Sequence, residues 1–274
     1  MHEILDHLPP SACVLDLGCR SGSFNAADFP FTTIRTDLVA QGAGSSTNFV
    51  QADATRLPFQ SNLFDAVICN HGLEHFVELK LALQEIGRVL RRDGALFISV
   101  PQATTLQDRV YRKLAKGGGH VNFFVRPEDL AGMLTWYSDL PHVATKVLYS
   151  SFLYLNRRNV HGGIPKRMSL FTWRWELPLA IFTYVVRAID VRLHTTLSVY
   201  GWAMYFGAVP EPVDLRPWTN VCIRCGQAHA SDWLQTIGAV HRKWLLFPSY
   251  RCPGCGASNF YSRDERFTTV QPRP

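Results

Sequence analysis

The sequence lacks the features of several common protein classes. Only 18% of its 274 residues are charged, which is too few for a disordered chain, and it contains no internal repeat or low-complexity tract. Its first residues, MHEILDHLPP, do not include the apolar segment of a secretory signal. We therefore expect a cytoplasmic protein, in which cysteines bind metal or lie buried more often than they form disulfides.

No apolar run is both long enough and uncharged enough to cross a membrane. The longest run, 177–209, is interrupted by four charged or titratable residues, which are Arg187, Asp190, Arg192 and His194. The sequence therefore predicts no transmembrane segment, and it leaves only peripheral contact with a membrane open.

Positive charge is concentrated in the second half of the chain. Residues 1–141 hold 12 Lys and Arg against 15 Asp and Glu, a net charge of −3, whereas residues 142–274 hold 16 against 7, a net charge of +9. A basic half favours an anionic partner, which leaves nucleic acid, a membrane surface and a phosphorylated substrate open. A solvated basic surface without a partner explains the same pattern.

Short apolar segments alternate with helical patterns along the chain, and 47% of the residues are hydrophobic. Strands are expected at 13–17, 32–38, 48–53, 64–70, 95–101, 144–155 and 198–209. Helices are expected at 76–92, ended by Asp93-Gly94, from Pro127 onward, and at 176–193. This alternation predicts an α/β domain built on a mostly parallel sheet.

The loop after the first expected strand, in CVLDLGCRSGSF, combines an acid with two glycines. Gly18 and Gly22 suit a loop whose backbone approaches a ligand at the carboxyl end of a strand. A dinucleotide fingerprint would need glycine at two further positions, which Arg20 and Ser23 occupy. Asp16 disfavours a pyrophosphate and suits a cationic ligand.

Five motifs, in the right order and spacing, resemble those of the class I S-adenosylmethionine-dependent methyltransferases, specifically the type-11 group. They are VLDLGCRSG, QADATRLPF, FDAVICNHGLEHF, EIGRVLRRDGALFISVP and HVNFFVRPEDLAGML, and they span about residues 12–140. The resemblance implies a Rossmann-like, mostly parallel seven-stranded sheet with helices on both faces, in a domain over 1–209. It also implies S-adenosylmethionine as the cofactor, whose ammonium and sulfonium groups suit the acid ahead of the glycine.

The resemblance also implies individual cofactor contacts. Asp37 falls where the family's acid accepts both ribose hydroxyls, Asp53 where an acid accepts from the adenine amino group, and Ala54 where the backbone meets the ring. The full expected cofactor set is Asp16, Gly18, Arg20, Gly22, Asp37, Leu38, Asp53, Ala54 and Asn70. Taken singly, Asp37 and Asp53 also fit ordinary turn acids.

Arg20 departs from the family pattern, which usually has glycine at this position. Three interpretations stay open. The guanidinium clamps the cofactor carboxylate, or it points away without effect, or it obstructs the site and leaves a non-catalytic fold. We favour the first two.

Methyl transfer to oxygen or nitrogen requires alignment and, for a protonated nucleophile, a general base. Three histidines are candidates. His71 follows the fourth expected strand, His75 stands beside Glu74, where packing or capping is the stronger expectation, and His120 follows a run of glycines that suits the hinge of a lid. For His120 a catalytic and a structural role are equally favoured.

The segment 102–195 must cover the substrate pocket, because almost nothing precedes the first strand. Its aromatic and basic residues suit a nucleotide, a phosphorylated glycan or a bilayer interface, and an ordinary apolar lid explains them slightly better. These residues are Trp136, Tyr137, Phe152, Tyr154, Trp173, Trp175, Tyr184, Arg157, Arg158, Lys166 and Arg167. The sequence lacks both an Asn-Pro-Pro-Tyr motif and a Pro-Cys pair, which counts against methylation of nucleic-acid bases.

Two Cys-x-x-Cys-Gly motifs near the C-terminus predict a structural zinc site. The proposed ligands are Cys222, Cys225, Cys252 and Cys255, with 26 residues between the two pairs. The pattern resembles a zinc ribbon over 219–274, joined by a proline-rich linker over 210–218. Two redox pairs are the competing interpretation, but the βαβ context is missing.

The sequence thus predicts a methyltransferase that acts on a small or carrier-linked metabolite, such as a glycan, lipid or natural-product intermediate. An RNA- or protein-modifying methyltransferase that grips its polymer with the ribbon and the basic half is the alternative. A non-catalytic scaffold with a decayed pocket is the third hypothesis.

Overall fold

The computed structural model describes nine stretches of the chain, which are 1–20, 22–39, 48–114, 119–156, 176–193, 195–210, 214, 216–243 and 247–263. The chain divides into two compact units. The first comprises Met1–Ala103, Gly119–Lys146 and Gly201–Leu215, and the second comprises Thr104–Gly118, Val147–Tyr200 and Arg216–Pro274. This division differs from the predicted one, because the ribbon residues share their unit with much of the predicted lid. Whether 219–274 folds independently stays a prediction.

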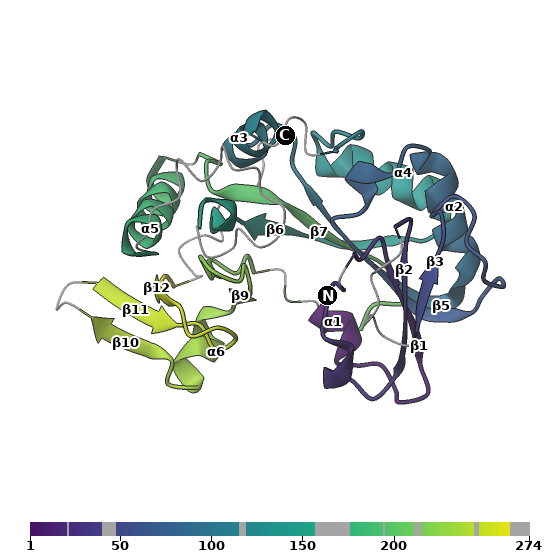
Figure 1. Ribbon diagram of the computed structural model, residues 1–274, viewed down its shortest axis with the longest axis horizontal. Helices are drawn as coiled ribbons and strands as arrows, with labels where there is room; N and C mark the ends of the chain where they lie inside the picture. Colours follow the sequence, from purple (N-terminus) through teal and green to yellow (C-terminus); the bar gives the residue numbers. More distant parts are fainter. Residues whose placement is uncertain are drawn as a thin grey trace. The chain divides into compact units, whose positions relative to one another are not determined.

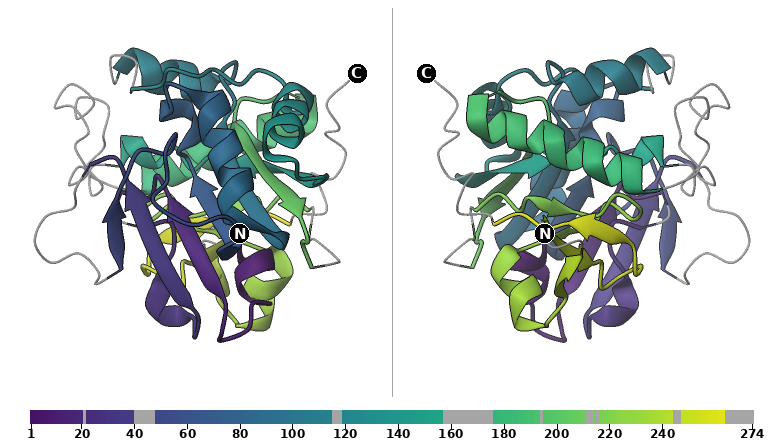
Figure 2. Two further views of the ribbon diagram at one scale, coloured as in Figure 1. Left: turned by 90° about the vertical axis from the view of Figure 1, so that its right-hand side faces the viewer. Right: turned by 90° about the vertical axis from the view of Figure 1, so that its left-hand side faces the viewer.

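A seven-stranded sheet has the order β3-β2-β1-β4-β5-β7-β6 (Figure 1). Its strands are β1 (Cys13–Leu17), β2 (Thr32–Asp37), β3 (Phe49–Gln51), β4 (Phe64–Asn70), β5 (Leu90–Pro101), β6 (His142–Tyr149) and β7 (Val199–Gly207). The pairs among β1 to β5 are parallel, and β7 runs antiparallel to β5. Figure 2 shows the first strands lying side by side. The predicted α/β, Rossmann-like, mostly parallel seven-stranded fold is confirmed.

The central strands are buried on both faces, as their continuous apolar runs predict. In β4, Phe64, Ala66, Val67, Ile68 and Cys69 are fully buried. Because alternate side chains of a strand point to opposite faces, a run of buried neighbours requires cover on both sides. The buried run ends at the carboxyl edge of the sheet, where the polar residues Asn70 and His71 follow.

Two helices of the first unit, α2 (Leu79–Val89) and α4 (Pro127–Ser138), contact each other. The prediction that the first of them extends over 76–92 is wrong at both ends, because the helix begins three residues later, at Leu79, and ends at Val89. The carbonyls of Arg88 and Val89 accept the N–H groups of Asn62 and Leu63, which ends the helix there. The following residues join β5, so Asp93-Gly94 lies inside a strand and does not form the predicted turn.

The remaining short elements of the first unit are α1 (His2–Leu5) and two 3-10 turns, η1 (Ala26–Asp28) and η2 (Leu73–His75). In α1, Ile4 and Leu5 are buried, and the Glu3 carboxylate lies 3.2 Å from Nζ of Lys146 in β6. Helix α4 begins at Pro127 as predicted and ends at Asp139, whose φ of 58° is left-handed. The turn η2 is the element that positions the candidate site described below.

The second unit is built around helix α5 (Glu176–Leu193), which matches the helix expected at 176–193. It also contains α3 (Leu106–Leu114), which the sequence did not predict, and η3 (Leu153–Leu155), where a strand continuing to 155 was expected. Phe152, Tyr154 and Ile223 share one core cluster with side chains of α5. Among the described residues, no helix is long and apolar enough to span a membrane.

The ribbon residues form two small sheets and one helix. The elements are β8 (Asn220–Val221), β9 (Ala228–His229), α6 (Ser231–Thr236), β10 (Val240–Lys243), β11 (Phe247–Arg251) and β12 (Ser258–Phe260). Strands β8 and β9 pair antiparallel, and so do β10, β11 and β12 in that order. Their core holds Cys222, Cys252, Leu234 and Tyr250, all buried.

Candidate functional site

The loop after β1 contains three residues with positive φ. The angles are 66° at Gly18, 46° at Arg20 and 112° at Gly22. This region favours glycine, which accounts for both glycines and for the family's usual glycine at position 20. A Cβ on Gly22 would lie 2.7 Å from Nη2 of Arg35, and one on Gly18 would lie 3.3 Å from the Phe76 ring. The glycines are thus required by backbone conformation and by protein neighbours, a reason different from the predicted approach of a ligand.

Asp16 lies one residue before the end of β1 and is fully buried. Its Oδ2 accepts the Ser23 N–H at 2.9 Å and lies 3.8 Å from Nε of Arg35. Burial raises the pKa of this carboxyl, although the Ser23 hydrogen bond and the Arg35 charge act in the opposite direction. The second oxygen, Oδ1, is buried and has no hydrogen-bond partner among the described residues. Asp16 therefore ties the loop to the strand and keeps one acceptor for a donor that the described residues do not provide.

Asp37 ends β2 beside this loop. Its carboxylate is held by two backbone donors, because Oδ2 accepts the Arg20 N–H at 2.8 Å and Oδ1 accepts the Val39 N–H at 3.1 Å. A carboxylate has about four acceptor positions, so two remain for hydroxyl donors. Leu38 is 64% exposed beside it, as an apolar contact for a ring requires. This arrangement fits the predicted ribose contact, which stays a prediction.

The Arg20 backbone is part of the site, and its side chain stays open to interpretation. The guanidinium makes no hydrogen bond or ion pair with the stretches of chain that the structure describes, and the residue is exposed. An anchored backbone with an unengaged cation fits both favoured interpretations, a clamp on the cofactor carboxylate and a side chain without effect.

Asp53 and Ala54 follow β3. The Asp53 carboxylate accepts both the backbone N–H and the hydroxyl of Thr55, each at 2.8 Å. These two hydrogen bonds form a local turn, which agrees with the interpretation of Asp53 as an ordinary turn acid. Ala54 is buried. Both residues lie directly after a strand of the parallel sheet, where its ligands bind, and their contact with adenine stays a prediction.

The carboxyl ends of β4 and β5 meet at Asn70 and Ser99. Ser99 donates its hydroxyl to Oδ1 of Asn70 at 2.5 Å and accepts the His71 backbone N–H at 3.0 Å. His71 has a φ of 57°, so the chain turns sharply just past the strand. Burial, followed by the nearby charges of His120 and His75, lowers the pKa of His71 to about 4. Its imidazole is uncharged at neutral pH and is a weak base.

The three candidate histidines lie close together. His71 lies 3.9 Å from the Glu74 carboxylate, measured from its Nδ1, and the rings of His75 and His120 are 5.0 Å apart in an edge-on arrangement. Ligand atoms of Glu74, His75 and His120 all lie within 4.8 Å of one another. The sequence identified the histidines but treated Glu74 only as a neighbour. The Leu-Glu-His motif places Glu74 directly before His75 in the sequence.

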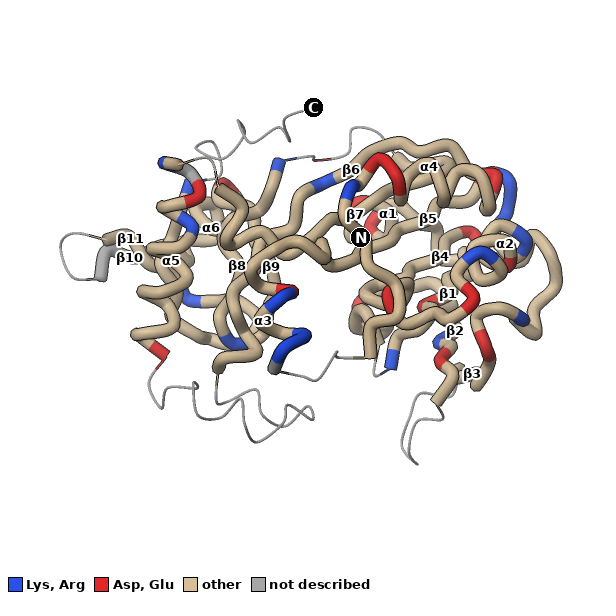
Figure 3. Tube along the Cα trace, turned by 90° about the horizontal axis from the view of Figure 1, so that it is seen from above, with Lys and Arg blue, Asp and Glu red and all other residues tan. Residues whose placement is uncertain are grey.

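The predicted lid is only partly described. Trp173, Trp175 and the basic residues Arg157, Arg158, Lys166 and Arg167 lie outside the described residues. Phe152 and Tyr154 are buried in the core of the second unit, so they pack and do not face a ligand. Trp136 on α4 is 82% exposed. Figure 3 marks the Lys and Arg positions, which include Arg112 and Lys113 in the last turn of α3.

The four predicted zinc ligands converge. Sγ of Cys222 lies 3.5 Å from Sγ of Cys255, Sγ of Cys225 lies 3.6 Å from Sγ of Cys252, and all four atoms lie within 4.8 Å of one another. Sulfurs at 2.3 Å from a tetrahedral zinc would be about 3.8 Å apart, so the spacing fits. His229 is a fifth neighbour, with Nε2 3.4 Å from Sγ of Cys252. The donor set fits a closed structural site.

The two cysteine turns have the same backbone geometry. In the first turn Gly226 donates to the carbonyl of Cys222 at 3.0 Å, and in the second Gly256 donates to the carbonyl of Cys252 at 2.8 Å. Both glycines have positive φ, 76° and 71°, a conformation that glycine adopts more readily than other residues. The Arg224 backbone N–H points at Sγ of Cys222 at 3.4 Å, and hydrogen bonds of this kind orient the ligands of metal sites.

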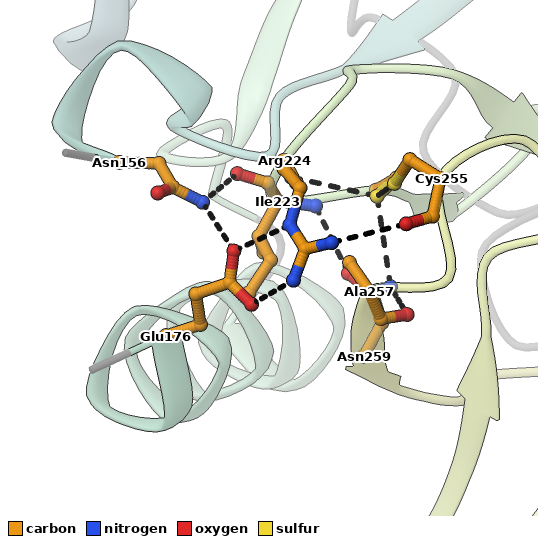
Figure 4. Close-up of polar contacts among 8 residues, drawn as sticks. Asn156, Glu176, Ile223, Arg224, Cys255, Ala257 and Asn259 are labelled. Carbon is orange, nitrogen blue, oxygen red and sulfur yellow. Dashed lines mark hydrogen bonds and ion pairs between the residues drawn. The ribbon is translucent and has the colours of Figure 1, made fainter. Parts of the chain in front are cut away.

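A polar network supports the first cysteine turn from α5 (Figure 4). Arg224 donates two hydrogen bonds to the Glu176 carboxylate, at 2.7 and 2.6 Å, and one to the Cys255 carbonyl at 3.0 Å. Asn156 donates to both Glu176 and the Ile223 carbonyl. The Glu176 hydrogen bond raises the pKa of Arg224 further. The pairing of Arg224 with Glu176 could not be predicted from local sequence, because the two residues are 48 positions apart.

The sequence predicts a contact face on the ribbon, made of Trp233, Arg242, Lys243, Trp244 and Arg251, and only part of it is described. Trp233 is 45% exposed and stacks on His229, with ring centroids 5.5 Å apart. Arg251 is exposed. Trp244 and the side chains of Arg242 and Lys243 lie outside what the structure describes.

Comparison with known proteins gives matches to methyltransferases. A family described as "Methyltransferase domain" matches residues 15–98. A demethylmenaquinone methyltransferase of Mycolicibacterium vanbaalenii is 31% identical over 57% of this chain and 75% of its own length. One of Mycolicibacterium paratuberculosis is 32% identical over 51% of this chain and 62% of its own length, so the chain spans less than two thirds of that relative.

Solved structures agree on the fold. A crystal structure from Anabaena variabilis, named for a methyltransferase of an antibiotic biosynthesis pathway, has a TM-score of 0.52 and 16% identity. The match covers 75% of this chain and 94% of that one. At this level of identity, the likeness bears on the fold alone.

Proposed function

The chain belongs to the type-11 family of S-adenosylmethionine-dependent methyltransferases, and we propose that it transfers a methyl group to an oxygen or nitrogen atom of a small or carrier-linked metabolite. The single observation that carries this proposal is the juxtaposition of Asp16 and Asp37 around the glycine loop. One carboxylate has a buried oxygen in need of a donor, and the other is fixed by the loop's own backbone.

The residues around the loop suit the cofactor that the family uses. When bound, S-adenosylmethionine supplies a methyl group on a positively charged sulfur. Asp37 would hold the ribose hydroxyls, while Leu38 would cover an apolar face. Asn70, fixed by Ser99, offers its amide at the carboxyl end of β4. The chain's own task is to orient the acceptor and to exclude water.

A proton on the acceptor needs a base among the histidines. His71 is a weak base, because its pKa of about 4 leaves little drive to take a proton at neutral pH. His75 holds the Gly119 carbonyl through Nδ1 at 3.0 Å, which leaves Nε2 as its acceptor nitrogen. His120, at the end of the glycine run, is the candidate we favour.

The substrate class draws support from the relatives, which are named for methylation of demethylmenaquinone. A lipid or other small acceptor is therefore favoured over a polymer. Four cysteine thiolates suit a cytoplasmic location, where thiols stay reduced.

The test is transfer of labelled methyl groups from S-adenosylmethionine to separate lipid, small-molecule, RNA and protein fractions, followed by identification of the methylated atom in the labelled product. We expect label in the lipid or small-molecule fraction, and we expect His120→Ala to lower turnover without loosening cofactor binding. Label confined to RNA or protein would replace the proposal with its polymer alternative. Absence of label together with absence of cofactor binding would indicate a non-catalytic scaffold.

A further inference from the structure

The Glu74, His75 and His120 side chains form a group with the composition of a metal site. Their ligand atoms lie within 4.8 Å of one another. We propose that they bind a divalent transition-metal ion of the zinc class, separate from the cysteine site. Two imidazoles and one carboxylate are the donor set of open zinc sites, which keep a fourth position for water or substrate. This proposal goes beyond the proposed function and does not depend on it.

The group is held in place by the surrounding backbone. Glu74 and His75 are neighbours in η2, and the segment after His120 is pinned to that turn. Val121 and Asn122 donate their backbone N–H groups to the Glu74 carbonyl at 2.8 and 3.1 Å. The Asn122 side-chain amide donates to the carbonyls of Leu73 and Phe76 at 2.8 and 2.7 Å. A segment over 40 positions away in the sequence is therefore fixed beside the turn by four hydrogen bonds.

The protonation of His75 suits ligation. A carbonyl oxygen only accepts hydrogen bonds, so the contact between Nδ1 of His75 and the Gly119 carbonyl, 3.0 Å long, requires the proton on Nδ1. The lone pair then lies on Nε2. Histidines that bind metal usually donate their other ring N–H to a backbone carbonyl or carboxylate in this way, which fixes tautomer and ring orientation. The carbonyl belongs to Gly119, the residue before His120, so this hydrogen bond also holds the His120 segment next to the His75 ring.

Burial supports the same assignment. Glu74 is 2% exposed, whereas the two histidines are half-buried. Buried charges in proteins are paired or coordinate metals, and this carboxylate lies 3.9 Å from Nδ1 of His71 on one side and near the ligand atoms of His75 and His120. Half-buried imidazoles leave the open position on the accessible side.

The site lies beside the predicted cofactor loop. A Cβ on Gly18 would come within 3.3 Å of the Phe76 ring and 3.5 Å of the Gly72 backbone, the residues that flank η2. A metal here would occupy the lone pairs of His75 and His120. The metal-ligand role and the general-base role favoured above for His120 are therefore alternatives, and the metal stoichiometry decides between them.

The test is the metal stoichiometry of the purified full-length chain. Apoprotein is titrated with cobalt(II) and, separately, with zinc followed by elemental analysis. We expect about two ions per chain, and only one of the two cobalt equivalents should show thiolate charge-transfer bands. Glu74→Gln and His120→Gln should each lose the equivalent without thiolate bands and keep the other.

His7→Gln is the matched control, because His7 is an exposed histidine remote from this group in the sequence. It should retain both equivalents. Wild-type protein that binds one ion, with thiolate bands only, would overturn the proposal even if the variants fail to fold. So would a second equivalent that survives in both Glu74→Gln and His120→Gln. Cofactor binding is measured on the same samples, so that failure of the methyltransferase proposal is recognised separately.

Discussion

Glu176→Gln tests whether the Arg224 network stabilises the first cysteine turn. The substitution keeps the size of the side chain but replaces one acceptor oxygen with a donor amide, so one of two charge-assisted hydrogen bonds is lost. Such bonds contribute about 1.5–3 kcal/mol when buried. The two side chains are 26% and 18% exposed, so solvent screening lowers the expected loss to about 1–2 kcal/mol.

The assay is hydrogen exchange of the backbone amides in 222–226, measured by mass spectrometry on zinc-loaded protein. A loss of about 1–2 kcal/mol corresponds to exchange faster by about 5- to 30-fold. Asp232→Asn is the matched control, because it weakens the ion pair with Arg216, whose side chains are 51% and 59% exposed. It should change exchange by less than about threefold. Equal acceleration of exchange by the two substitutions would show that the Arg224–Glu176 hydrogen bonds do not specifically stabilise the first cysteine turn.

Two further predictions concern the ribbon and the glycine loop. Cys252→Ser should abolish zinc binding at the ribbon and make 219–274 sensitive to proteolysis, because a structural zinc supplies on the order of 10 kcal/mol; a protease-resistant ribbon without its zinc would contradict this. Arg20→Gly should remove a left-handed penalty of about 1–2 kcal/mol, offset by about 0.5–1 kcal/mol of glycine entropy. It should leave the cofactor dissociation constant within about tenfold in calorimetry, whereas much tighter binding would identify Arg20 as an obstruction.

The sheet and the cysteine site follow from local sequence patterns. Strand β4 is a continuous apolar run, and its predicted bounds, 64–70, match the structure. The four cysteines that converge in the structure were predicted as ligands from spacing alone, because each pair sits in one tight turn and each turn is closed by a glycine. In both cases the information lies within a few neighbouring residues.

The features that the sequence did not reveal depend on contacts between distant residues. Helix α2 ends at Val89 because Asn62 and Leu63 meet its last carbonyls, and no local signal marks that point. Gly22 is required partly by Arg35, which comes from the next strand. The closeness of Glu74 to His120 arises only because the segment after His120 is pinned to η2 by hydrogen bonds.

The most direct measurement of the central claim is calorimetric titration of the zinc-loaded protein with S-adenosylmethionine and with its demethylated product. We expect binding heat with both ligands, because both carry the ribose and adenine groups that the loop is proposed to hold. We also expect weakening of at least about tenfold in Asp37→Ala, because hydrogen bonds to a charged acceptor contribute about 1.5–3 kcal/mol. Asp37→Asn, which keeps one acceptor oxygen, should fall between that variant and the wild type. No heat with either ligand, or unchanged affinity in Asp37→Ala, would contradict the account.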